Sequence, residues 1–311
     1  MNSTESAVSF SEADTRADEM HRTIETWLTD LQELTDEARA SDEFTAWLNI
    51  QSRFHEYSVN NTLLIKQQCP NATKVAGYRT WQSEFDRQVS KGESAIWIWA
   101  PSIARQCPDC GNAPSYHEKI GCEYDETPPE EWERGIVGFR PVPVFDVSQT
   151  EGEPLPNLDT DVTGEGSTLL SSLLDTADTL EIDVDLVSPE EWSHGQTQGV
   201  CFPRGEQREQ PHVCVKQQSN EAAVAHTLVH EFAHALIHTD GFDNSEEAKR
   251  EVEAESVAYI VSRYFGLDAD NAAFYLASWQ RDEAAELLVR LNRIRDTAVR
   301  LIDVLERPMT D

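Results

Sequence analysis

Lysine is almost missing from this chain of 311 residues, which carries a net charge of −32 at neutral pH. Its lysines are confined to positions 66, 74, 91, 119, 216 and 249, and the acidic residues are spread along the whole chain. An acidic surface with little lysine is typical of proteins from a high-salt cytoplasm, where acidic groups keep the surface hydrated. We therefore expect a halophilic protein. The alternative is an acidic protein that avoids or mimics nucleic acid.

Long apolar runs are also missing. No segment approaches the roughly 20 apolar residues that a membrane-spanning helix needs, which argues against a membrane partner. Residues 1–30 are polar and acidic and lack the apolar core of an export signal. We therefore predict a cytoplasmic protein, in which we do not expect the six cysteines to form disulfides.

The clearest motif present is His230-Glu231-Phe232-Ala233-His234, inside a mostly apolar, helix-forming stretch at 220–238. Residues four apart share a helix face, so both imidazoles can bind one metal ion with Glu231 beside them. This arrangement is typical of zinc peptidases, in which two histidines bind the ion and the glutamate is the general base. The alternative is a helix with two ordinary histidines. The apolar flanks disfavour it, because buried polar side chains are costly without a partner.

A catalytic zinc needs a third protein ligand, and the next predicted helix, residues 245–265, offers Glu251, Glu253 and Glu255. This helix resembles the second helix of the gluzincin peptidases. There, an acidic ligand is followed four residues later by an acid that orients a zinc-bound histidine. The resemblance implies that Glu251 is the third ligand and Glu255 the orienting residue. Glu253 is the rival ligand, and a solvated acidic face is the alternative to both.

A second candidate metal site lies in a cysteine-rich insertion at residues 107–122. Cys107-Pro108-Asp109-Cys110-Gly111 has the form of a zinc-ribbon knuckle, in which two thiolates bind one ion. His117 and Cys122 could complete a structural zinc site that fastens the predicted loop at 101–134. A flexible loop with free thiols, or a redox pair, is the alternative.

The segment 51–105 is net positive, although the chain as a whole is strongly acidic. Aromatic residues are interleaved with its basic residues, as in proteins that hold single-stranded nucleic acid without reading its sequence. A core-forming segment that contains few acids is the alternative. We expect the DNA contacts to come from Arg53, Tyr57, Asn61, Lys66, Lys74, Tyr78, Arg79, Trp81, Arg87 and Lys91.

Several motifs in about residues 50–152 resemble those of the ArdC-type antirestriction proteins. They include Tyr57-Ser58-Val59-Asn60-Asn61-Thr62-Leu63-Leu64-Ile65, Ala76-Gly77-Tyr78-Arg79-Thr80-Trp81, Lys91-Gly92-Glu93 and Gly138-Phe139-Arg140-Pro141. In that family this part is a single-stranded-DNA-binding domain. The C-terminal half is similar to the zinc-peptidase domain, of the ImmA/IrrE kind, that such proteins carry. The resemblance implies antirestriction or protection of mobile-element DNA, and the cysteine insertion departs from the family pattern.

Together these features predict an α+β protein. Its predicted parts are an acidic tail and first helix (1–40), a mixed helix-and-strand domain for single-stranded DNA (41–150), a linker (151–167) and a mostly helical, gluzincin-like peptidase domain (168–311). Inside the DNA-binding domain we expect a short helix that ends at Arg87 and strands at 94–100 and 138–147.

The predicted function is binding of single-stranded DNA combined with zinc-dependent cleavage of a protein or peptide, as in a zinc metalloendopeptidase. Two other functions fit the same residues. One is a DNA-protecting protein whose zinc domain is structural and not catalytic. The other is a regulatory peptidase that cleaves a repressor or another DNA-bound protein.

Overall fold

The computed structural model describes residues 8–10, 12–33, 37–153, 155, 166–205, 208–238, 246–267, 274, 279 and 283–307. Contacts group the chain into two compact units. Unit 1 is Met1–Thr23 with Gln67–Glu153, and unit 2 is Ile24–Lys66 with Pro154–Asp311. Helices α1 (Arg16–Glu33) and α3 (Val59–Gln68) contribute residues to both. None of the described helices combines the length and the apolar content that crossing a membrane requires.

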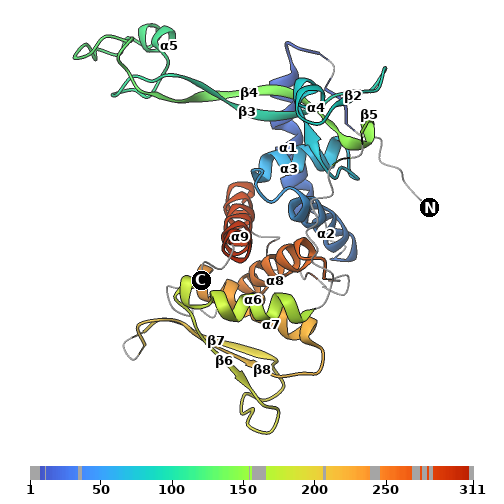
Figure 1. The fold of residues 1–311 in the computed structure, drawn as a ribbon. Coiled ribbons are helices and arrows are strands. Elements are labelled where there is room, and N and C mark those ends of the chain that lie inside the picture. The colour runs from blue at the N-terminus through green and yellow to red at the C-terminus, as the bar shows by residue number, and fades with distance from the viewer. Residues whose placement is uncertain are drawn as a thin grey trace. The chain divides into compact units, whose positions relative to one another are not determined.

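Unit 1 is built on antiparallel strand pairs (Figure 1). A three-stranded sheet has the order β1-β4-β3, and a separate pair joins β2 to β5. The strands are β1 (Val75–Ala76), β2 (Arg87–Val89), β3 (Ile96–Arg105), β4 (Arg134–Asp146) and β5 (Thr150–Gly152); the short helices are α4 (Tyr78–Ser83), α5 (Pro114–Lys119) and the 3₁₀ turn η1 (Val147–Gln149).

Buried polar groups fasten α4 and the segment before β1 to the end of β4. Asp146 is buried and accepts hydrogen bonds from the backbone N–H groups of Thr73 and Lys74, at 2.8 and 3.0 Å. Trp81 of α4 is fully buried and donates its indole N–H to the Phe145 carbonyl at 2.9 Å. Asp146 and Trp81 thus both have hydrogen-bond partners in the interior.

β3 and β4 form one long ribbon, with α5 in the connection between them (Figure 1). Their pairing runs from Ile96 opposite Val144 to Arg105 opposite Arg134. Both strands are longer than the predicted 94–100 and 138–147, and they extend into the predicted loop 101–134. The outer part of the ribbon buries neither face, so it has no alternation of apolar and polar residues by which a strand could be recognised.

The prediction of a short helix that ends at Arg87 was wrong. α4 ends at Ser83, and Asp86 has a positive φ of 50°. That left-handed conformation cannot continue a right-handed helix. Arg87 instead begins β2 and pairs with Gly152 of β5.

Unit 2 is mostly helical and contains one small sheet. In the sheet order β6-β8-β7, β6 (Asp183–Val187) runs parallel to β8 (His212–Lys216), and β7 (Gly199–Phe202) runs antiparallel to β8. The helices are α2 (Glu37–Arg53), α6 (Gly166–Thr176), α7 (Glu221–Ile237), α8 (Glu247–Tyr264), α9 (Ala284–Leu305) and the 3₁₀ turn η2 (Asp178–Leu180).

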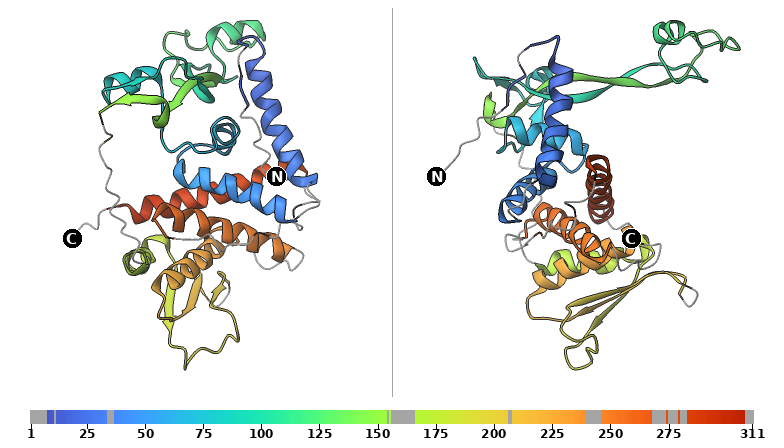
Figure 2. Two further views of the ribbon diagram at one scale, coloured as in Figure 1. Left: turned by 90° about the vertical axis from the view of Figure 1, so that its right-hand side faces the viewer. Right: turned by 180° about the vertical axis from the view of Figure 1, so that it is seen from behind.

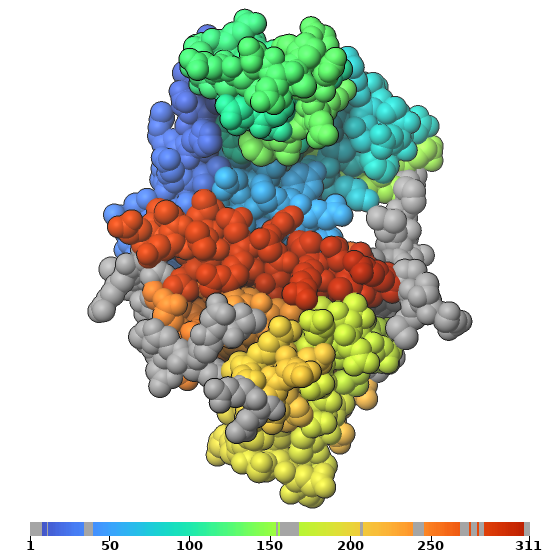
Figure 3. Space-filling view, turned by 90° about the vertical axis from the view of Figure 1, so that its left-hand side faces the viewer, coloured from blue at the N-terminus to red at the C-terminus, as the bar shows by residue number. Residues whose placement is uncertain are grey.

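α7 is the central helix of unit 2. It contacts β7 and β8 of the sheet as well as α6 and α8, and Figure 2 shows the sheet beside it from two further directions. Leu228 and Phe232 of α7 are fully buried, as are Val257 and Ile260 of α8. α9 packs along α8 and forms a band along one face of unit 2 in Figure 3.

The predicted α+β class is confirmed, whereas the gluzincin-like character of the C-terminal part stays a prediction. Contacts place residues 41–66 in unit 2, while the predicted boundaries at 41–150 and 168–311 rest on motifs and also stay predictions. Most of the predicted linker 151–167, and residues 1–7 of the predicted acidic tail, lie outside the described residues.

Candidate metal centres and nucleic-acid contacts

α7 brings the two motif histidines together. Asn220 caps the helix, because its side-chain oxygen accepts a hydrogen bond from the Ala223 N–H at 3.3 Å. One helical turn then separates His230 from His234, and their Nε2 atoms lie 3.1 Å apart. The spacing of four residues therefore does place both imidazoles on one face.

α8 supplies a carboxylate to this pair. Glu251 places Oε2 at 3.3 Å from His230 Nε2, and Oε1 at 3.3 Å from His234 Nε2. Ligand atoms bound at about 2.0–2.2 Å to a tetrahedral zinc lie roughly 3.3–3.6 Å apart, so these spacings suit one ion. The Glu251 side chain is 56% exposed, against 18% and 16% for the histidines, so the group is open to solvent on the carboxylate side. The three residues could hold a metal ion.

The histidines and carboxylates of this group shift one another's pKa values. Hydrogen bonds to His230 and then to His234 hold the pKa of Glu251 far below its ordinary value. Burial lowers the pKa of His230, but the carboxylates of Glu251 and Glu255 outweigh it and raise that pKa to about 10. Glu251 therefore stays ionised over the physiological range, whereas an incoming metal ion would have to displace the proton of His230.

Each motif histidine has a partner on its other ring nitrogen. His230 Nδ1 lies 3.0 Å from Glu255 Oε2, and His234 Nδ1 lies 3.0 Å from His238 Nδ1. Glu255 also contacts His226 Nε2 at 3.2 Å with its other oxygen. Burial raises the pKa of Glu255, but its two histidine partners bring it down to about 2. Such partners fix the orientation of ligand imidazoles, which is the role expected of Glu255.

Glu253, the rival ligand, has other partners. It is fully buried and contacts Arg290 at 2.7 Å, Arg293 at 3.1 Å and His238 at 3.0 Å. It is not in the group with His230 and His234, whereas Glu251 is. Glu253 serves instead as the buried counter-charge of the α9 arginines. Its contact with His238, which in turn contacts His234, connects it to the group of His230, His234 and Glu251.

Glu231 is held between α7 and the edge of the sheet. Its side chain is buried, and a Cβ at Gly199 of β7 would lie only 2.5 Å from its Oε1 atom. Burial is the main cause that raises the pKa of Glu231, and Glu251 adds to it, against the two histidines. Burial also raises the pKa of the Cys201 thiol to about 12, with a further contribution from Glu231. No sequence signal marked Gly199, because its role depends on how β7 packs against α7.

The cysteine cluster at the end of the β3–β4 ribbon is also assembled. One potential ligand atom each from Cys107, Cys110, His117 and Cys122 lies within 4.8 Å of the others. Cys110 Sγ lies 3.6 Å from His117 Nδ1. Gly111 has a positive φ of 71° and closes the knuckle with an N–H bond to the Cys107 carbonyl. This is a second group that could hold a metal ion.

The cluster rests on a small apolar support. The ring of His117 packs edge-on against Trp132 with centroids 5.1 Å apart, and Trp132 is almost fully buried. Trp132 donates its indole N–H to the Thr127 carbonyl at 2.9 Å. Burial raises the pKa of the Cys110 thiol, but hydrogen bonds from Asn112 and His117 bring it down to about 6. A thiol that ionises this readily is a good metal ligand.

The expected DNA-contact residues divide into exposed and buried members. Asn61, Lys66 and Trp81 are buried, and Lys66 pairs with Glu43 at 2.6 Å. In this conformation these three side chains are therefore not exposed for contact with DNA. Tyr57, Lys74 and Arg87 are half-buried. The exposed members are Arg53, Tyr78, Arg79 and Lys91. Tyr78 bonds Gln88 through its hydroxyl at 2.9 Å and leaves its ring exposed.

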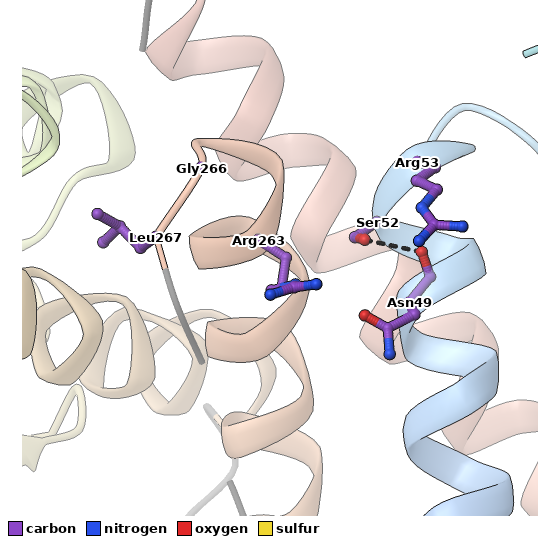
Figure 4. A pocket seen from close by; sticks show the side chains of 6 residues that line it. All are labelled: Asn49, Ser52, Arg53, Arg263, Gly266 and Leu267. Carbon is purple, nitrogen blue, oxygen red and sulfur yellow. Dashed lines mark hydrogen bonds between the residues drawn. The ribbon is translucent and has the colours of Figure 1, made fainter. Parts of the chain in front are cut away.

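A small cavity of about 220 Å³ lies between α2 and the end of α8 in unit 2 (Figure 4). Arg53 and Arg263 line it, and Figure 4 shows the Arg263 side chain extending from α8 toward α2. The Tyr259 hydroxyl joins the same helices by donating to Asn49 Oδ1 at 3.0 Å. Guanidinium groups suit phosphate, and this cavity contains none of the metal-group residues.

The fold and the sites define a class: an α+β protein with a histidine–carboxylate group suited to a metal ion. The family comparison is more specific. Residues 12–136 match the model of the N-terminal domain of anti-restriction factor ArdC. The chain therefore carries an N-terminal domain of the ArdC type, which confirms for this part the resemblance noted in the motifs.

An uncharacterized protein of Bacillus anthracis, pXO2-81, is 24% identical over 304 residues, which cover 90% of this chain. The chain spans about half, 51%, of the length of that relative. Two crystal structures of the antirestriction protein ArdC from plasmid R388 are also similar. The Mn(II)-bound structure has a TM-score of 0.49 and 15% identity over 93% of this chain and 98% of that one. The metal-free structure has a TM-score of 0.43 and 16% identity, over 80% and 85%.

Proposed function

We propose that this chain binds single-stranded DNA through its ArdC-type domain and hydrolyses peptide bonds at a zinc centre in unit 2. The observation that supports the enzymatic part most directly is the grouping of His230, His234 and Glu251, with Glu231 buried beside them. Two imidazoles and one carboxylate are the ligands of a recognised type of catalytic zinc site. We propose protection of DNA from restriction as the biological role, on the basis of the matched family domain.

Zinc in this group would polarise the substrate carbonyl and activate water for attack. Glu231, buried beside the group, would take the proton from the attacking water. Glu255 and His238 hold the rings of His230 and His234 in place through their Nδ1 atoms.

Substitution of Glu231 by glutamine tests the enzymatic part. Glu231→Gln should retain bound zinc, measured by elemental analysis, because the ligand atoms are unchanged. It should lose hydrolysis of labelled casein, measured with and without an oligothymidylate strand. Glu247→Gln, an exposed acid in the first turn of α8, is the matched control and should keep both properties. Wild-type protein that binds zinc but never cleaves casein would favour the alternative, a DNA-protecting protein with a structural zinc domain.

Charge reversal tests the DNA-binding part. Arg79→Glu and Lys91→Glu remove exposed positive charge from unit 1, so each should weaken binding of fluorescent oligothymidylate and reduce the salt dependence of log Kd by about one. Arg300→Glu, at an exposed position of α9, is the control for net charge. We also propose that the acidic surface is adapted to high salt, so titrations should extend from low to high salt. Equal weakening by all three variants would refute a local DNA site.

A further inference from the structure

A third group of metal-ligating side chains lies on the small sheet of unit 2, away from the motif histidines. Asp185 of β6 pairs in register with Cys214 of β8, so their side chains point to the same face. His212 is two residues before Cys214 on the same strand and shares that face. Strand register alone therefore places a carboxylate, an imidazole and a thiol side by side.

The face that carries these side chains is opposite to the one that packs on α7. Gly199 of β7 faces Glu231 of α7, and it pairs with Val215 of β8. Val200, the next residue of β7, pairs with Cys214. Because successive residues of a strand point to opposite faces, Cys214 lies on the far side of the sheet from Glu231. The group is thus separate from the proposed zinc centre.

The three donor atoms converge on one point. His212 Nε2 lies 3.1 Å from Asp185 Oδ2 and 3.1 Å from Cys214 Sγ, and the ligand atoms of all three residues lie within 4.8 Å of one another. A hydrogen-bonded acid–base relay would use both ring nitrogens, one for the carboxylate and one for the thiol. Here both partners contact the same nitrogen, which carries either one proton or one lone pair. Because Asp185 and Cys214 both contact the same nitrogen of His212, the arrangement suits three ligands of one cation better than a hydrogen-bonded acid–base relay.

We propose that Asp185, His212 and Cys214 bind a divalent transition-metal ion of the zinc type. A mixed set of carboxylate, imidazole and thiolate suits zinc or cobalt, and it does not suit magnesium or calcium, which take oxygen ligands. In a tetrahedral zinc site a nitrogen and a sulfur ligand lie roughly 3.5 Å apart, so the 3.1 Å contact needs only a small adjustment.

The surroundings protect the thiol and leave the carboxylate accessible. Cys214 is 8% exposed, the His212 side chain 22% and the Asp185 side chain 64%. Phe202 pairs with His212 across the strands, and Arg208 lies over the Phe202 ring at 5.1 Å. An ion can enter from the exposed Asp185 side, while the Cys214 thiol itself is buried. Bound there, it would fasten β6 to β8, the strand with which β6 pairs.

Cobalt spectroscopy tests the site in the full chain. In a Cys107→Ser, Cys110→Ser background, which removes the knuckle, Co²⁺ should still give a thiolate-to-cobalt charge-transfer band in the near ultraviolet. The histidine–carboxylate centre contains no thiolate and cannot produce it. Adding Cys214→Ser should abolish the band, whereas adding Cys69→Ser should leave it. A band that is absent from the background protein, or that survives Cys214→Ser, would overturn the proposal.

A second measurement needs no substitution. Wild-type protein is alkylated with iodoacetamide with and without added zinc, and modification is followed by mass spectrometry of the peptide that contains Cys214. Zinc should slow alkylation of Cys214 and leave that of Cys69 unchanged. Equal rates at Cys214 in both conditions would show that this cysteine has only a hydrogen-bonded histidine neighbour and would refute the metal site.

Discussion

Gly199→Ala should displace Glu231, the proposed general base, without changing the proposed zinc ligands. The new Cβ would lie 2.5 Å from Glu231 Oε1, 2.7 Å from Glu231 Cγ and 2.8 Å from Thr227 Cγ2. The carboxylate must move by about 0.9 Å to reach the 3.4 Å at which ordinary contact begins. Because Glu231 is buried, it has little room for this movement. The ligand atoms of His230 and His234 are not touched.

A displacement of about 1 Å at a reacting group costs roughly 100-fold in rate, or about 2.7 kcal/mol of transition-state stabilisation. Overpacking also costs about 1–3 kcal/mol of folding free energy, and each kcal/mol lowers the Tm by about 2–4 °C in a unit of this size. Gly199→Ala should therefore show a loss of casein hydrolysis, a lower Tm and unchanged zinc content.

The matched control is Gly205→Ala, because a Cβ at Gly205 meets no atom within 4 Å. This variant should keep the wild-type rate and Tm. If Gly199→Ala matches Gly205→Ala in both measurements, β7 does not hold Glu231 and the argument from close contact fails. The Tm comparison decides this point even if casein is a poor substrate.

Three further outcomes are expected. Glu253→Gln should destabilise unit 2 by up to about 3–5 kcal/mol in urea unfolding, because Arg290 then keeps only the partly exposed Glu246 as its counter-charge, yet zinc content should not change. Burial raises the pKa of Asp146, but its hydrogen bonds lower that pKa overall. Its stabilising contribution is therefore complete above the unfolded pKa of about 3.9 and is lost as the pH falls through the folded pKa, so Asp146→Asn should flatten the acid side of the stability–pH curve. Cys107→Ser should lower bound zinc by one ion per chain in elemental analysis, whereas Cys69→Ser should not.

The grouping of His230, His234 and Glu251 was predictable because these residues come from two consecutive helices. Helix periodicity alone decides that His230 and His234 share a face, and that Glu251 and Glu255 share another. The choice of Glu251 over Glu253 needed the resemblance to a known helix pair, since the packing of α8 against α7 decides which face turns to the histidines. The partner of Glu231 on β7 was not predictable, because nothing in the sequence states which strand lies against α7.

The residues expected to contact nucleic acid show a different limit of sequence-based prediction. Composition identified a basic, aromatic segment, but it could not tell which side chains turn inward. Trp81 and Lys66 are buried with a carbonyl and a carboxylate as partners, while Tyr78 is exposed. Basic and aromatic residues serve in a core as readily as on a surface, so only tertiary packing separates the two uses.

The stability of the outer part of the β3–β4 ribbon depends on the cysteine cluster at its end. From Ala100 and Arg140 outward the ribbon has no buried strand residue, and its next buried side chains are Cys107, His117 and Trp132. Two strands without a packed face are marginal in water, so the outer ladder depends on the cluster that closes it. If this cluster binds metal, as predicted, loss of the ion would let the outer ribbon fray without unfolding the rest of the unit. The number of ordered residue pairs in the ribbon would then depend on the available metal concentration. Amide hydrogen exchange along β3 and β4 would measure this dependence.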